Sequence, residues 1–77
     1  MSNLEKIINI IRNVMEVELD PDMEITEDMD LRADLHVDSL SMVMIAGEIE
    51  EEFGINVEME EMSDIRTVED ILNRING

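Results

Sequence analysis

The chain has 77 residues, which is enough for one small domain and too few for two. Its 21 acidic and 5 basic residues give a formal net charge of -16, which argues against nucleic acid or an anionic membrane as a partner. Cysteine is absent, which excludes disulfide bonds and cysteine-based metal sites, and the 44% hydrophobic content favours a folded domain over an acidic disordered segment.

The first predicted helix runs from about Asn3 to Glu16. Ser2 and Glu5 have the spacing of a capping box, in which each side chain accepts a hydrogen bond from the other residue's backbone N–H group. Apolar residues then recur at helical spacing, and they are Leu4, Ile7, Ile8, Ile11 and Met15. The stretch from Met1 to Lys6 lacks the basic start and long apolar run of a signal peptide, and no uncharged stretch approaches the length of a membrane span. We therefore expect a cytoplasmic protein without membrane insertion.

A long loop is predicted from about Val17 to Val37, because Pro21 disfavours helix and cannot donate a backbone hydrogen bond. A loop of this length needs anchors in a compact domain. We expect a short turn near Thr26 to Met29 and apolar residues that hold the loop across the helix ends. The expected anchors are Ile25, Met29, Leu31 and Leu35.

The acidic residues of this loop do not form a calcium-binding motif. A calcium loop that started at Asp20 would need glycine at the position of Ile25 and glutamate at the position of Leu31. We therefore predict no metal site in the chain. Loose binding of divalent cations stays open, because a cation that gathers crowded carboxylates relieves their repulsion.

The longest predicted helix covers Ser39 to Phe53. Asp38 is a strong N-cap candidate, because its carboxylate can accept the free N–H groups of the first turn. One arc of this helix is expected to face the core, and it contains Met42, Ile45, Ala46, Ile49 and Phe53. A second apolar strip lies on roughly the opposite side and contains Leu40, Met44 and Gly47, with Glu51 among them. A partner must cover this second strip, or it stays exposed to water.

Ser39 occupies the first helical position, where unpaired N–H groups and the helix dipole favour negative charge. A phosphate ester on its hydroxyl would be well placed there. His36, the only histidine, lies three residues earlier and has two interpretations. It could contact such a phosphate when protonated, or it could be a loop residue that tolerates a left-handed conformation, and we favour the second interpretation.

The remainder of the chain predicts two further helices. Gly54 is a suitable helix stop, residues 55–57 form an extended link, and Glu58 to Met62 can form about one turn. Thr67 is expected to cap the last helix with Asp70 in a capping box. The apolar stripe of that helix is Val68, Ile71, Leu72 and Ile75, before it ends at Asn76 and Gly77. The predicted fold is an all-α, small four-helix bundle with three main helices, one short helix and a long loop between the first two main helices.

The start of the longest predicted helix resembles the second helix of acyl carrier proteins. The residues that carry this likeness are Asp38-Ser39-Leu40, Val43, Ile45, Ile49 and Glu50-Glu51-Glu52-Phe53. The likeness continues without an obvious gap from Thr26 to Gly77. It implies a free-standing acyl carrier domain over residues 1–77, with a covalent 4′-phosphopantetheine arm from coenzyme A on Ser39 and Asp38 as the helix cap beside it.

The resemblance also implies a set of partners. A phosphopantetheinyl transferase would attach the arm, and the monomeric, non-catalytic carrier would present thioester-bound acyl groups to acyl synthases and acyltransferases of fatty acid, polyketide or specialised lipid biosynthesis. We expect acidic residues to steer partners with basic docking surfaces, and apolar residues to make the close contact. The expected docking face is Leu40, Met44, Glu48 and Glu51.

Departures from the family pattern and two alternatives stay open at this point. Family members often have glycine at the position of His36 and acidic residues at those of Ser41 and Met44. These departures could mean a specialised pathway rather than housekeeping fatty acid synthesis. The cargo could also be an aminoacyl or polyketide group, because the same arm would carry it and the partner enzymes would select it. Alternatively, the chain could be an acidic helical interaction module that binds a partner helix through Leu40 and Met44 and is never modified on Ser39.

Overall fold

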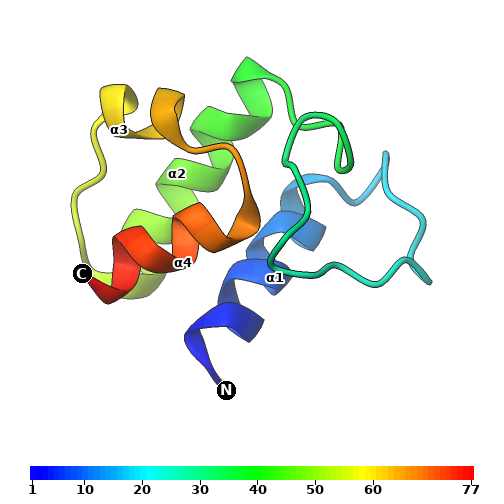
Figure 1. Cartoon of the computed structure of the whole chain (residues 1–77), viewed down its shortest axis with the longest axis horizontal. Coiled ribbons are helices and arrows are strands. Elements are labelled where there is room, and N and C mark those ends of the chain that lie inside the picture. The colour runs from blue at the N-terminus through cyan, green and yellow to red at the C-terminus, as the bar shows by residue number, and fades with distance from the viewer.

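The computed structural model describes the whole chain, residues 1–77, as four helices without a strand. The helices are α1 (Asn3–Val14), α2 (Ser39–Phe53), α3 (Met59–Asp64) and α4 (Val68–Asn76). Helix α1 packs against both α2 and α4, and α3 contacts α2. Figure 1 shows the long connection between α1 and α2 along one side of the helices. The predicted all-α bundle is therefore confirmed, and none of its helices is long and apolar enough to cross a membrane.

Both predicted capping boxes are present. Ser2 Oγ accepts the N–H group of Glu5 at 3.1 Å, and Glu5 Oε1 accepts the N–H group of Ser2 at 3.2 Å. At the start of α4, Thr67 Oγ1 accepts the N–H group of Asp70 at 3.2 Å, and Asp70 Oδ2 accepts that of Thr67 at 3.0 Å. These bonds satisfy N–H groups that have no carbonyl partner in the first turn, which fixes where each helix begins.

Helix α1 ends two residues earlier than the predicted boundary at Glu16. The chain leaves the helix at Met15, whose backbone has φ -100° and ψ 19°, and continues through turns. This exit allows Met15 and Leu19 to be buried in the same core. The burial of these two side chains therefore stabilises the chain more than a continued helix would.

The core consists of 18 buried residues, all of them hydrophobic. The predicted inward arc of α2 is confirmed for four of its five residues, which are Met42, Ile45, Ala46 and Ile49. Phe53 is only half-buried, and the ammonium group of Lys6 lies 5.8 Å from the centroid of its ring. Ile10 is buried although it lies outside the predicted stripe of α1, because α1 packs against two helices and needs a wider apolar face.

The long loop is anchored as predicted and at two further points. Ile25, Leu31 and Leu35 are buried and Met29 is half-buried, while the turn near residue 26 closes with an N–H···O bond from Met29 to Thr26 at 3.3 Å. The further buried anchors are Leu19 and Val37. Met23 is also packed against the core, so seven apolar side chains along the loop contact the core or lie within it.

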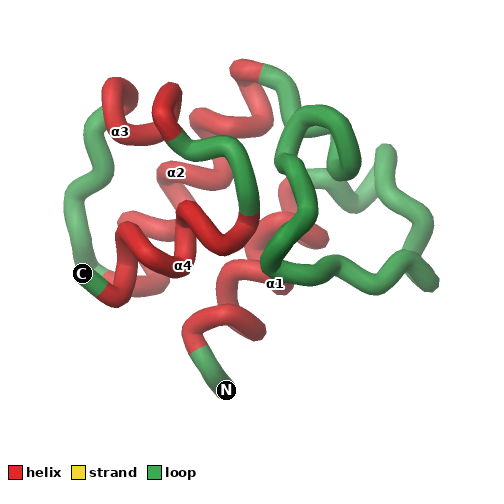
Figure 2. Tube along the Cα trace, in the orientation of Figure 1, coloured by secondary structure: helices red, strands yellow, loops and turns green.

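The loop also pairs with the segment that leads into α4. The N–H group of Leu31 donates to the carbonyl of Arg66 at 2.9 Å, and that of Val68 donates to the carbonyl of Met29 at 3.2 Å. Figure 2 shows these two loop segments side by side. These bonds give the middle of the loop backbone partners without forming a strand.

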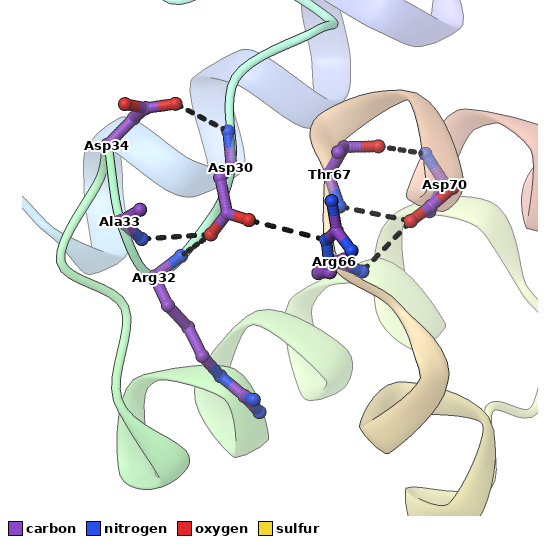
Figure 3. Close-up of polar contacts among 7 residues, drawn as sticks. All are labelled: Asp30, Arg32, Ala33, Asp34, Arg66, Thr67 and Asp70. Carbon is purple, nitrogen blue, oxygen red and sulfur yellow. Dashed lines mark hydrogen bonds and ion pairs between the residues drawn. The ribbon is translucent and has the colours of Figure 1, made fainter.

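Carboxylates lock this contact between the loop and α4 (Figure 3). Asp30 Oδ1 accepts the N–H groups of Arg32 at 2.9 Å and Ala33 at 2.8 Å, and Arg66 Nε lies 3.5 Å from Asp30 Oδ2. Asp70 Oδ2 accepts the N–H groups of Arg66 at 2.9 Å and of the following threonine. These donated hydrogen bonds lower the pKa values of both aspartates.

We expect Asp70→Asn to lower the free energy of unfolding at pH 7 by about 1 kcal/mol, because a neutral amide accepts hydrogen bonds more weakly than a carboxylate. The folded-state pKa of Asp70 lies below its ordinary value of 3.8, so this stabilisation is complete above that value. It is lost as the pH falls through the folded-state pKa. Urea denaturation at pH 7, 5 and 3 should show the difference from wild type at the first two values and a smaller one at pH 3.

The control is Asp64→Asn, because the Asp64 side chain is exposed and makes no hydrogen bond or ion pair. It removes the same charge without removing a cap. An equal loss of stability in both variants, or a loss with Asp70→Asn that does not change with pH, would contradict this role of Asp70.

The short helix α3 begins at Met59 and extends to Asp64, two residues past its predicted end. Gly54 ends α2 with φ 65°, as its position predicts. Arg74 of α4 then secures the connection: its Nε donates to Glu61 Oε2 at 3.0 Å and its Nη2 donates to the carbonyl of Asn56 at 3.0 Å. Helix α3 also buries its own residue Met62, and these contacts hold α3 beside the start of α2.

Candidate functional site

Ser39 is the first residue of α2, and its side chain is exposed. Its hydroxyl makes no hydrogen bond within the chain. The preceding Asp38 caps the helix as predicted, since its Oδ1 accepts the N–H group of Ser41 at 2.8 Å. This hydrogen bond lowers the pKa of Asp38, so its carboxylate is ionised at neutral pH. Ser39 therefore offers a free hydroxyl to a second molecule.

The backbone before α2 turns the site outward. His36 has φ 59°, the only positive φ outside glycine, which confirms its interpretation as a loop residue in the left-handed conformation. Val37 is buried and its N–H group donates to the carbonyl of Leu31 at 2.8 Å. Because the chain is fixed at Val37, the next two residues reach the surface.

No base in the chain is positioned to activate this hydroxyl. His36 forms no hydrogen bond to Ser39 or Asp38, and the Asp38 carboxylate is directed at the helix N-terminus. No group of three or more histidine, cysteine or acidic side chains could hold a metal ion. The chain therefore places no general base of its own beside Ser39.

A cavity of about 220 Å³ lies beside Ser39, between the start of α2 and α3. Three methionines contribute to its wall, and its lining residues are Arg32, Ser39, Met42, Met59, Met62 and Ser63. A larger hollow of about 450 Å³ lies after α1, but only one of its five lining residues is hydrophobic, and it contains no nucleophile. The smaller cavity is the one that suits an apolar chain attached nearby, because methionine side chains adapt their shape to a guest.

The second apolar strip of α2 is exposed, as predicted. Leu40 is 70% exposed and Met44 is 50% exposed, and the side chains of Glu48 and Glu51 also reach solvent. Among the other exposed large apolar residues, Val43 lies on the same helix and Met59 lies on α3. Val43 follows Leu40 by three residues, a spacing that could have placed it on the same face.

Residues 5–75 match the family model described as "Phosphopantetheine attachment site". The chain belongs to the acyl carrier protein family. This carrier is 42% identical over 76 residues to an acyl carrier protein of Rickettsia bellii, with 97% of this chain and 90% of the relative covered. It is 33% identical over 75 residues to one of Thermobifida fusca, with 97% of this chain and 87% of the relative covered.

A solved structure described as an acyl carrier protein, from Mycobacterium tuberculosis, has the same fold as this carrier. The TM-score is 0.82 and the sequence identity 29%, with 94% of this chain and 92% of the other covered. The family is non-catalytic, uses 4′-phosphopantetheine as its covalent cofactor and works with a phosphopantetheinyl transferase and acyl-handling enzymes. A free serine hydroxyl at a helix N-terminus, beside a cavity lined by three methionines and an arginine, fits this group.

Proposed function

We propose that the carrier holds its 4′-phosphopantetheine arm on Ser39 and that residues 1–77 act as one acyl carrier domain. The observation that supports this most directly is the exposed Ser39 hydroxyl, which lacks a hydrogen bond and lies at the mouth of a cavity. Bound to serine, the arm supplies the terminal thiol that a cysteine-free chain lacks, and this thiol carries acyl groups as thioesters.

The transferase supplies the base that the carrier does not have. In the attachment step, Ser39 Oγ forms an ester bond to phosphorus and the phosphoanhydride bond of coenzyme A breaks. The hydroxyl proton passes to the transferase, and the adenosine bisphosphate half of coenzyme A leaves. The carrier contributes the geometry: Asp38 fixes the first turn of α2, and the N–H groups of that turn favour the negative charge of the resulting phosphate.

The lining of the cavity favours an alkyl cargo. Met42, Met59 and Met62 offer apolar surface to an alkyl chain. The other lining residues are Arg32, Ser39 and Ser63, and none of them is an acid that could pair with the ammonium group of an aminoacyl cargo. We therefore propose a role in fatty acid or related lipid biosynthesis, with polyketide or aminoacyl transport as alternatives. A monomeric state and a cytoplasmic location remain predictions from the sequence.

The proposed function is tested by incubating the purified carrier with coenzyme A and a broad-specificity phosphopantetheinyl transferase. Intact-protein mass spectrometry is expected to show a gain of one phosphopantetheine per chain. A carrier that gains no mass under conditions that load a known acyl carrier protein would instead support the unmodified interaction module.

We further propose that Leu40, Met44, Glu48 and Glu51 form the docking face, together with Val43. Their exposure, and their place on the helix that begins at Ser39, support this assignment. Leu40 and Met44, the apolar side chains of the predicted face, would contact the partner's surface near its active site. The glutamates farther along α2 would meet basic residues of the transferase, acyl synthase or acyltransferase.

We expect the double substitution Glu48→Lys and Glu51→Lys to slow loading at low ionic strength by about tenfold or more, because it reverses the charge that steers a basic partner. The difference should shrink at 0.5 M salt, because screening weakens steering. The loading rate is measured by intact mass over time.

The matched control is the double substitution Glu16→Lys and Glu18→Lys, which changes the net charge equally on the segment after α1. Neither side chain forms a hydrogen bond or ion pair, and both are exposed. Equal slowing in both double variants would assign the effect to net charge and remove these two glutamates from the docking face.

A further inference from the structure

Arg32 is the only basic side chain of this carrier without a partner. Among the other four, Arg66 and Arg74 form ion pairs with Asp30 and Glu61, at 3.5 Å and 3.0 Å. Lys6 lies 4.0 Å from Glu52, and Arg12 donates to backbone carbonyls of the loop. In a chain with 21 acidic residues, an unpaired guanidinium requires an explanation.

The guanidinium of Arg32 is also placed at the candidate site. Arg32 and Ser39 line the same cavity. Figure 3 shows the Arg32 side chain directed away from the pair formed by Asp30 and Arg66 and toward the ribbon of α2. Arg32 thus borders the same cavity as Ser39, and no ion pair within the chain competes for an anion there.

The backbone of Arg32 is fixed although its side chain is free. Its N–H group donates to Asp30 Oδ1 at 2.9 Å, and its carbonyl accepts the N–H group of His36 at 3.2 Å. The preceding Leu31 is fully buried. The backbone that carries the guanidinium is therefore already ordered. Binding of an anion by Arg32 then costs less conformational entropy than binding by an arginine on a mobile loop.

We propose that Arg32 is a positioning residue that pairs with the phosphate of the arm on Ser39. This inference rests on the proposed attachment of the arm to Ser39. A phosphate there adds negative charge beside the ionised Asp38, in a chain that already carries -16. A guanidinium suits this phosphate because its planar fork can donate two hydrogen bonds to phosphate oxygens.

This pairing fixes the direction in which the arm leaves Ser39. An arm whose phosphate is bound to Arg32 leaves Ser39 toward the methionine-lined cavity, because Arg32 is part of that cavity's wall. Without Arg32 the root of the arm rotates freely about the serine side chain. The pairing thus favours shelter of the acyl chain while leaving the thiol end mobile for partners.

The test compares loaded wild-type carrier with loaded Arg32→Gln at low ionic strength by nuclear magnetic resonance. In wild type, the Nε–H resonance of Arg32 should shift between the unloaded and loaded forms, and the phosphorus line should be broader than in the variant. Salt at 0.5 M should narrow the wild-type phosphorus line toward that of the variant, because screening weakens the ion pair.

The matched control is Lys6→Gln, which removes one positive charge beside Phe53, at the far end of α2 and about 20 Å from Ser39 by helical rise. It should leave the phosphorus line as in wild type. Circular dichroism melts establish that both variants fold.

An Arg32 resonance that is identical in the unloaded and loaded forms, or a phosphorus line that Arg32→Gln leaves unchanged, would overturn the proposal. Failure of the arm to attach would appear earlier, as the absence of a mass gain in the wild-type carrier. The two failures are therefore distinguishable.

Discussion

Alanine in place of Ser39 is expected to abolish loading by the transferase completely, with no phosphopantetheine found in the intact mass. The reason is chemical, since alanine has no oxygen to form the ester bond to phosphorus. The fold should persist, because the Ser39 side chain is exposed and makes no hydrogen bond within the chain. The cap also remains, since Asp38 bonds to the N–H group of Ser41. A melting curve close to that of wild type would establish this.

The matched control is Ser41→Ala, two residues farther along the same helix. Its side chain is half-buried and the Asp38 bond uses its backbone, so the variant should load as wild type does. Loading of Ser39→Ala, or loss of loading in Ser41→Ala with Ser39 intact, would remove Ser39 from the proposed role.

The second large effect is a loss of stability on the buried side of α2, away from the proposed docking face. Ile45 is fully buried at the centre of α2, and Ile45→Ala is expected to lower the free energy of unfolding by about 2–5 kcal/mol through lost burial and a residual cavity. A domain of this size has a total stability of roughly 4–12 kcal/mol, so the loss is a large fraction of it. Urea denaturation at pH 7 measures this change.

Val43→Ala provides the matched control on the same helix. Val43 is 49% exposed, so its truncation should change the free energy of unfolding by no more than about 0.5 kcal/mol. If both variants lost the same stability, α2 would not have the separate buried and exposed sides that the structure shows.

The features of the fold that depend on neighbouring residues could be predicted from the sequence. Asp38 and Thr67 were recognisable as caps because a cap depends on residues within one helical turn. The inward arc of α2 followed from helical spacing, as did the exposure of Leu40 and Met44. The position of Ser39 at the first helical residue follows from the same cap.

The features that join distant segments could not be predicted in this way. The bonds between the loop and the segment around Arg66, and those of Arg74 to α3, join residues whose spacing carries no periodic signal. The early end of α1 depends on the burial of Leu19 in a core that only the folded chain defines. Likewise, only the folded loop brings Arg32 to the cavity that Ser39 also lines.

The site of attachment itself can be measured by fragmentation of the loaded wild-type carrier in a mass spectrometer. The added mass should be absent from N-terminal fragments that end at Asp38 and present in those that include Ser39. Chain fragments that place the group on Ser2, Ser41 or Ser63 would contradict the central role of Ser39.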